Sequence, residues 1–188
     1  MNEDHVFIGI GGNLSSKMIG SPLAVMRAAV CALPSMRIVV RRRSRWYSSA
    51  AVPPSDQPPF INGVLDVETP LDAKSLLDAL HRLEAAFGRV RRAPNEPRVL
   101  DLDLLAFGPM IEQADAGLCV PHPRMHLRAF VLKPLAELAP DWLHPRLGLS
   151  VREMLAALPA GQSAEPLDAS LEESVAGLPD LPSAGERA

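Results

Sequence analysis

The chain has 188 residues and a mass of 20.3 kDa, with 47% hydrophobic residues, 22% charged residues and a formal net charge of −3. This composition is typical of one globular domain, with or without a tail, and excludes wholesale disorder. No apolar run approaches the roughly 20 residues of a membrane helix, and the acidic N-terminus does not resemble a secretory signal. The two cysteines, Cys31 and Cys119, form no CxxC pair and exclude a disulfide framework, so we expect reduced thiols and a cytoplasmic protein.

Charge is unevenly distributed along the chain. Residues 161–188 carry six acidic residues and one arginine, so the remainder is mildly basic. Arginine outnumbers lysine 16 to 3. The planar guanidinium group suits phosphate, which indicates an anionic ligand, although a GC-rich genome would give the same bias.

The first half of the chain predicts three strands and one helix. A strand over His5–Ile10 runs into a Gly-Gly-Asn turn, and a helix begins at Ser21–Pro22 and ends before Pro34. Further strands are expected over Ile38–Tyr47 and Ile61–Glu68. The residues between them, 48–59, are proline-rich in their second half and are expected to form a loop.

The second half predicts a helix between Asp72 and Gly88, a basic loop over 89–98 and a strand over Val99–Phe107. The resulting order βαββαβ is that of a ferredoxin-like α+β fold, an antiparallel sheet with helices on one face. Additional C-terminal helices are expected near Arg128–Leu138 and over Ser150–Leu158. We therefore predict a domain over 1–159 and an acidic, mostly disordered tail over 160–188 that is dispensable for activity.

Asp101 and Asp103 form the strongest local signal for chemistry. In a strand their side chains point to the same face about 7 Å apart, while the intervening leucines face a core. Two like charges on one face require a cation, and Mg²⁺ bound through carboxylates and substrate phosphates is suitable. A solvated edge strand beside an arginine is the alternative.

The loop before this strand carries Arg89, Arg91, Arg92 and Arg98. Guanidinium groups beside two carboxylates are typical of a phosphate site with its metal clamp, and a solvated run of charge is the alternative. His122, within Pro121-His122-Pro123, could contact phosphate or transfer a proton, but no zinc motif surrounds it. The glycine-rich turn near Gly11 matches neither a dinucleotide-binding nor a Walker A motif.

Phe60-Ile61-Asn62 follows the proline-rich loop and joins an aromatic ring to an amide. Stacking and paired hydrogen bonds hold flat heterocycles in this way. A buried phenylalanine and a turn asparagine would explain the same residues.

Together these motifs resemble the hydroxymethyldihydropterin pyrophosphokinase family of folate biosynthesis. The resemblance covers roughly residues 5–158 and is carried by five motifs in family order: Gly11-Gly12-Asn13-Leu14, Asp56 to Asn62, Gly88-Arg89-Val90-Arg91, Pro97 to Leu105, and Val120 to Met125 followed by Arg128-Ala129-Phe130. It implies transfer of the diphosphoryl group of ATP, the co-substrate, to the pterin hydroxymethyl group with release of AMP.

The resemblance also implies roles for individual residues. Asp101 and Asp103 would hold two Mg²⁺ ions, and Arg89 and Arg98 match the catalytic loops. The ATP-binding positions match His81, Glu84, Arg91, Leu104, His122 and Arg128. The pterin-binding positions match Ser49, Ala50, Val52, Phe60, Asn62 and Phe130.

The chain departs from the family pattern in its loops. The segment between Arg91 and Arg98 is one residue shorter than usual and lacks a tryptophan, and Ser49-Ala50-Ala51 replaces the usual Thr-Pro-Pro. These departures bear on loop closure and rate rather than on the type of reaction. The tail is either inert or a link to a neighbouring folate enzyme such as dihydropteroate synthase.

An RNA-binding module is the main alternative, because the same element order builds such domains and Arg41–Arg45 could follow a phosphate backbone. Aromatic residues make up only 4% of the chain, and the paired aspartates would repel RNA. We therefore expect ATP and a reduced pterin as ligands, and neither nucleic acid nor membrane as a partner.

Overall fold

The computed structural model describes residues 5–51, 56–89, 97–113 and 117–168. The strands are β1 (Val6–Gly12), β2 (Val39–Arg43), β3 (Tyr47–Ser49), β4 (Phe60–Glu68), β5 (Asp101–Phe107), β6 (Glu112–Gln113), β7 (Cys119–Val120) and β8 (Ala164–Pro166). The α-helices are α1 (Pro22–Ala32), α2 (Ala73–Ala86), α3 (Ala129–Leu138) and α4 (Val151–Ala156). Two 3₁₀ helices, η1 (Leu33–Met36) and η2 (Met125–Leu127), complete the order.

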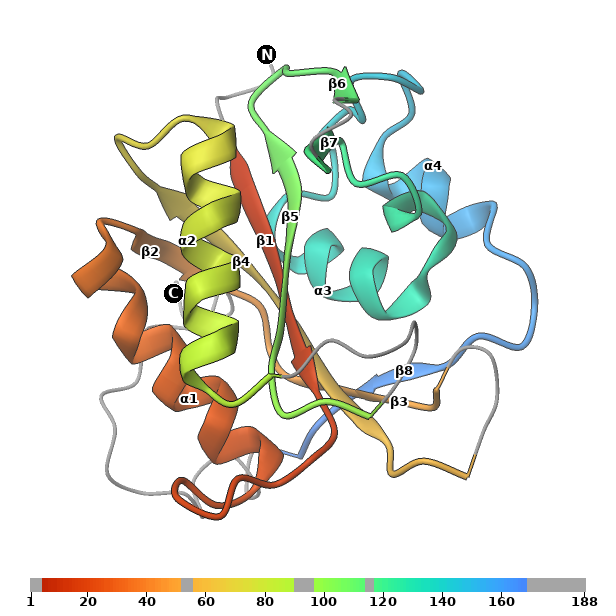
Figure 1. Cartoon of the computed structure of the whole chain (residues 1–188). Coiled ribbons are helices and arrows are strands. Elements are labelled where there is room, and N and C mark those ends of the chain that lie inside the picture. The colour runs from red at the N-terminus through yellow and green to blue at the C-terminus, as the bar shows by residue number, and fades with distance from the viewer. Residues whose placement is uncertain (1–4, 52–55, 90–96, 114–116, 169–188) are drawn as a thin grey trace, which may run out of the picture.

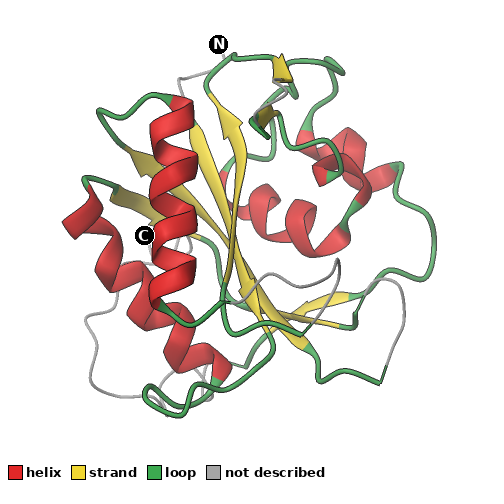
Figure 2. Cartoon of the chain, in the orientation of Figure 1, coloured by secondary structure: helices red, strands yellow, loops and turns green. Residues whose placement is uncertain are grey.

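Six strands form one antiparallel sheet in the order β5-β1-β4-β3-β8, with β2 also paired to β4. The sheet runs through the middle of the molecule, with α1 and α2 on one side and α3 and α4 on the other (Figures 1 and 2). This arrangement confirms the predicted α+β, ferredoxin-like fold with additional C-terminal helices.

The alternation of side chains along the central strands divides the core in two. Ile8, Ile10, Leu102 and Leu104 pack under α1 and α2 in the larger hydrophobic cluster. The opposite faces of the same strands contribute Phe7, Val64 and Leu105 to a second cluster beneath α3 and α4. Each helix stays on its face because it buries an apolar stripe there.

Local capping explains where the helices begin. Ser21 and Asp72 cap α1 and α2 by accepting hydrogen bonds from backbone N–H groups three residues later. Ser150 and Glu153 form the predicted capping box of α4. At the end of α2, Gly88 adopts φ +86°, a conformation that favours glycine.

The predicted strand over Ile38–Tyr47 is wrong in its continuity, because the structure divides it into β2 and β3. The Ser44 hydroxyl accepts a hydrogen bond from Val64 N and donates to Arg45 O, while Arg45 N donates to the Glu137 carboxylate. These side-chain bonds replace the regular ladder at the break. As a consequence β3 includes Ser48 and Ser49, which the prediction assigned to a loop.

The first residues of the predicted tail contribute to the sheet. Ala164–Pro166 form β8, which pairs with β3 and joins the main sheet. Short polar and proline-containing segments such as this one lack the alternating pattern by which strands are recognised. The part of the predicted tail beyond residue 168 lies outside the described residues.

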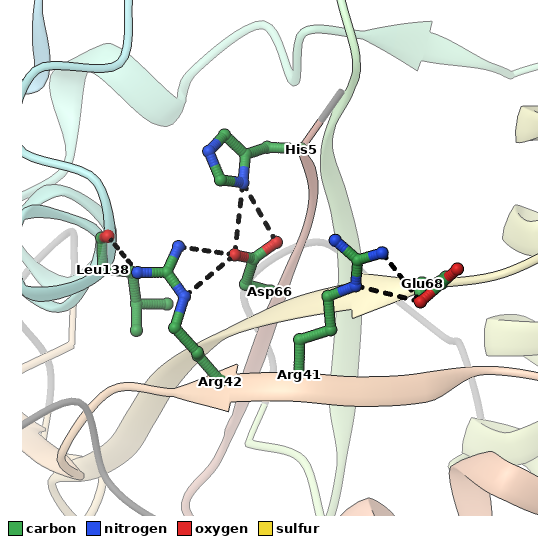
Figure 3. A network of polar contacts seen from close by, with 6 residues as sticks. All are labelled: His5, Arg41, Arg42, Asp66, Glu68 and Leu138. Carbon is green, nitrogen blue, oxygen red and sulfur yellow. Dashed lines mark hydrogen bonds and ion pairs between the residues drawn. The ribbon is translucent and has the colours of Figure 1, made fainter. Parts of the chain in front are cut away.

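Two arginines of β2, Arg41 and Arg42, form hydrogen bonds and ion pairs within the protein. Asp66 is 3% exposed, and its carboxylate accepts a hydrogen bond from the Arg42 guanidinium group (Figure 3). Arg42 also donates to Leu138 O at the end of α3. The same Asp66 carboxylate lies 3.2 Å from His5 Nδ1. Arg41 pairs with Glu68 on the surface (Figure 3). These contacts tie β2 and β4 to α3, and they give the arginines a structural use that requires no phosphate backbone.

Candidate active site

The floor of the candidate site is the part of the sheet face opposite α1 and α2 that lies at the start of β5 and the end of β1, beyond the cluster around Phe7 and Leu105. Asp101 and Asp103 of β5 lie opposite Gly11 and Gly9 of β1, and Gly11 lies opposite Asn62 of β4 on its other side. The structure therefore places both aspartates on one face, as predicted, with glycines between them and the amide. The glycines therefore add no side chain of their own between the two polar groups.

Gly11 holds the Asn62 amide in place by leaving room for it. A Cβ atom on Gly11 would lie 2.8 Å from Asn62 Oδ1, closer than such atoms normally come. On the other side, Asn62 Nδ2 donates to the Ser49 hydroxyl over 2.9 Å. Asn62 and Ser49 are both buried, so the amide has a fixed orientation.

Asp101 is bound by two arginines that come from the basic loop. The guanidinium group of Arg89 contacts Asp101 Oδ1, and that of Arg98 contacts Asp101 Oδ2. The structure thus brings together both arginines and the carboxylate that the sequence singled out. Arg91 and Arg92 lie outside the described residues.

Glu84 links this cluster to the edge of the sheet. Its Oε1 accepts a hydrogen bond from Leu102 N over 2.7 Å and also contacts Arg89. The edge strand β5 would otherwise present this N–H group without a strand partner, and buried backbone donors require one. Glu84 is only 1% exposed, so its carboxylate is an internal anchor for Arg89.

The surroundings of Asp103 disfavour its charged form, compared with a carboxylate on the surface. Burial, and then the nearby Asp101 charge, raise its pKa to about 6, although Arg128 and Arg89 act in the opposite direction. A carboxylate pair of this kind is stabilised by a hard divalent cation. Within the described ranges no cluster of three or more potential metal ligands is found.

Asn13 contributes to the site through Arg98, a contact that was not predicted from its sequence position. It is 3% exposed, its Oδ1 accepts from Arg98 N over 2.9 Å, and its own N–H donates to Arg98 O over 2.9 Å. Its Nδ2 donates to Pro58 O over 3.1 Å. Asn13 therefore fixes the backbone of Arg98 against the loop before β4, and its place directly after a Gly-Gly turn is the signal that could have indicated this.

His122 and Arg128 border the aspartates from the segment before α3. His122 N donates to Leu105 O over 2.8 Å, at the bulge where the pairing of β1 and β5 shifts, and His122 Nδ1 accepts from Arg124 N over 3.2 Å. Burial and the charges of Arg128 and Arg124 lower the pKa of His122 to about 4. The ring is therefore neutral near pH 7, with its proton on Nε2, and can serve as a hydrogen-bond donor.

The two predicted aromatic walls each lie beside an arginine. The Arg98 Cζ atom is 5.7 Å from the centroid of Phe60, and the Arg128 Cζ atom is 5.4 Å from the centroid of Phe130. Cation–π contacts of this kind orient both partners. The residues expected to hold a pterin are thus joined directly to those expected to hold phosphate. Ala50 is exposed at the end of β3, and Val52 lies outside the described residues.

Two positions expected near the nucleoside lie away from the aspartate face. The side chain of Leu104 is 4% exposed and packs in the cluster under α1 and α2, so only its backbone is available to a ligand on the other face. His81 is half-buried on α2, three residues before Glu84. The roles of His81, Glu84 and Leu104 toward ATP stay predictions.

Comparisons with known proteins agree with this geometry. The family described as 7,8-dihydro-6-hydroxymethylpterin-pyrophosphokinase matches residues 7–140. A Pseudomonas aeruginosa protein named 2-amino-4-hydroxy-6-hydroxymethyldihydropteridine pyrophosphokinase is 43% identical over 157 residues, covering 82% of this chain and 91% of the relative. A Synechocystis sp. protein of the same name is 42% identical over 150 residues, covering 79% of this chain and 73% of the relative.

A solved structure supports the fold independently. The structure described as HPPK-DHPS in complex with substrates matches with a TM-score of 0.58 at 11% sequence identity. The match covers 84% of this chain and 43% of that larger chain. At this level of identity the likeness concerns the fold alone.

Proposed function

The chain belongs to the hydroxymethyldihydropterin pyrophosphokinase family, and on that premise we propose that it transfers the diphosphoryl group of ATP to the hydroxymethyl group of 6-hydroxymethyl-7,8-dihydropterin. The pterin hydroxyl oxygen bonds to the β-phosphorus, the bond between that phosphorus and the α-phosphate oxygen breaks, and AMP leaves. The proton of the hydroxyl group passes to water or to a phosphate oxygen. The reaction supplies the activated pterin of folate biosynthesis.

One observation carries this proposal: a single face of the sheet joins the paired carboxylates and their arginines to a fixed amide and to the aromatic residue two positions before it. Asp101, Arg89 and Arg98 lie in direct contact, and Arg98 also lies against Phe60. Asn62, two residues beyond Phe60 on β4, has its amide fixed by Ser49. A phosphate donor and a flat acceptor therefore have adjoining places on one rigid sheet.

The chemistry needs positioning and charge neutralisation rather than a nucleophilic side chain. Arg89 and Arg98 would bind phosphate oxygens, because each guanidinium group has five N–H donors and can contact a carboxylate and a phosphate together. Arg128 and the neutral His122 would complete the ATP side. Phe60 and Phe130 would stack on the pterin, and Asn62 would read its hydrogen-bonding edge.

Two Mg²⁺ ions are proposed to complete the site through Asp101 and Asp103. The residues fit this role, because the Asp103 carboxylate is half-buried and lies near a second carboxylate whose charge raises its pKa. Bound Mg²⁺ supplies charge neutralisation on the phosphates of ATP. By holding the ions, Asp101 and Asp103 would keep this positive charge on the part of the site that binds ATP.

The experiment that tests the proposed function measures the nucleotide product. The purified full chain is incubated with ATP and Mg²⁺, with and without reduced hydroxymethylpterin, and AMP and ADP are separated. AMP that forms only with the pterin, without ADP, supports the proposal. Formation of ADP, or of AMP independently of the pterin, would contradict it.

The expected partners are related to two larger proteins that match this chain. The matching HPPK-DHPS structure and a Pneumocystis carinii folic acid synthesis protein, of which this chain covers 20%, are larger than this chain. They support the prediction that a folate enzyme such as dihydropteroate synthase is a partner. Among the described residues no helix is both long enough and apolar enough to cross a bilayer. A cytoplasmic location stays a prediction.

A further inference from the structure

The segment after α4 closes on the site rather than leaving the domain. Ala164 of β8 is fully buried opposite Ser49 of β3, and Leu167 N donates to Trp46 O over 2.8 Å. Lys133 of α3 donates from Nζ to Ala164 O over 2.8 Å. This segment, residues 161–167, therefore ties β3 on one side to α3 on the other.

Gln162 makes the closest connection between this segment and the site. Its Oε1 accepts from Ala129 N over 3.0 Å, and its Nε2 donates to Leu127 O over 2.9 Å. The two bonds enclose Arg128, at the junction between η2 and α3. Arg128 is the N-cap residue of α3, and its own side chain makes no capping bond, so Gln162 supplies the partner that the first helical N–H group needs.

The two hydrogen bonds of Gln162 lie next to Arg128 and Phe130, which are proposed to contact ATP and the pterin. Arg128 is half-buried. Burial and the charge of Arg124 lower the pKa of its guanidinium group, whereas the charges of Asp103 and Asp101 favour its charged form. Phe130 directly follows Ala129, whose N–H group binds Gln162, and its ring contacts Arg128. Phe130 also packs against Tyr47, Ala129 and Ala164, which join β3, α3 and β8.

We propose that Gln162 is a positioning residue for the reaction: it holds the backbone at Arg128 so that Arg128 meets ATP phosphates while Phe130 stacks on the pterin. This inference rests on the proposed function. Because one amide binds the backbone on both sides of Arg128, directly before Phe130, its loss should weaken ATP and pterin binding together. A shift of about 1 Å at such a junction is enough to lower the rate markedly.

Kinetics of three full-length variants test the inference. Gln162→Ala removes both bonds and should raise KM for ATP and for pterin and lower kcat/KM about tenfold or more. Gln162→Glu keeps the acceptor for Ala129 N but faces Leu127 O with an acceptor, so it should recover part of the loss. Glu165→Ala changes a side chain on the same segment that is 71% exposed and should match the wild type.

The outcomes separate this inference from the proposed function. If the wild type makes no pterin-dependent AMP, the proposed function fails. If the wild type is active and Gln162→Ala has wild-type KM values and kcat per folded molecule, with only a lower melting temperature, then Gln162 is merely structural and the inference is wrong. A rise in both KM values that Gln162→Glu partly reverses supports it.

Discussion

The two faces of the central sheet use the same strands for different purposes. Toward α1 and α2, β1 and β5 present Ile10, Leu102 and Leu104, all nearly fully buried. Toward the other side, the neighbouring positions in the same strands are Gly11, Asp101 and Asp103. One face therefore serves packing along its whole length, whereas the other combines a second hydrophobic cluster with the candidate site. Because strand side chains alternate, a shift of one residue in register would exchange these roles, so the apolar face also fixes the geometry of the site.

Apart from loss of the Asp103 carboxylate, the largest effect is expected at Arg98. Arg98→Ala removes the guanidinium group from Asp101 and Phe60 but leaves the backbone bonds to Asn13, so the loop should stay in place. We expect turnover to fall on the order of 10²- to 10³-fold, because the lost group stabilises phosphate charge in the transition state. Steady-state kinetics with thermal unfolding measure this effect.

The matched control for Arg98 is Arg41→Ala, whose side chain pairs with Glu68 on the surface and lies on the far part of the sheet. It should keep wild-type turnover. Equal activity losses in the two variants would contradict the assignment of Arg98 to the chemical face.

A smaller, more selective effect is expected at Gly11. In Gly11→Ala the new Cβ atom would displace the Asn62 amide, so KM for the pterin should rise about tenfold while KM for ATP changes little. Because both changes act on one amide, Gly11→Ala combined with Asn62→Ala should be no worse than Asn62→Ala alone. Additive losses in the double variant would show that Gly11 acts by another route.

The smallest effect concerns stability at acid pH and lies outside the site. His144 is 4% exposed, and burial, with His126 and Arg146 nearby, lowers its pKa to about 4, against an ordinary value of 6.5. Between these two values the unfolded chain binds more protons than the folded chain. This contribution to stability is therefore complete above pH 6.5 and is lost as the pH falls toward 4, by at most about 1.4 kcal/mol per pH unit.

Denaturant unfolding at pH 7 and pH 5 measures this linkage. His144→Gln should lose less stability between the two pH values than the wild type, whatever its stability at pH 7. His122 contributes a change of the same sign, so some pH dependence should persist. An unchanged difference between the two pH values would show that His144 does not titrate as its burial implies.

Local patterns in the sequence predicted the parts of the fold and site that depend on one strand or helix. Alternation placed Asp101 and Asp103 on one face, and apolar periodicity with capping residues predicted α1 and α2 to within a few residues. The basic loop was correctly expected to adjoin the aspartates through Arg89 and Arg98.

Contacts between distant segments could not be predicted in the same way. Asn13 reaches residues in two later loops, Glu84 binds a backbone group of β5, and Gln162 caps a helix that begins 33 residues earlier. The strand β8 is specified by its partner β3 and by Lys133, not by its own composition. Tertiary contacts of this kind leave no periodic signal in one sequence.

The measurement that tests the separation of the two faces most directly compares Asp103→Ala with Leu102→Ala, its neighbour in β5. Both variants are assayed for pterin-dependent AMP formation per folded molecule and for the free energy of unfolding. Asp103→Ala should abolish turnover while the fold survives. Leu102→Ala should lose roughly 2–5 kcal/mol of stability and keep most of its activity per folded molecule. Near-normal turnover in Asp103→Ala would contradict the account.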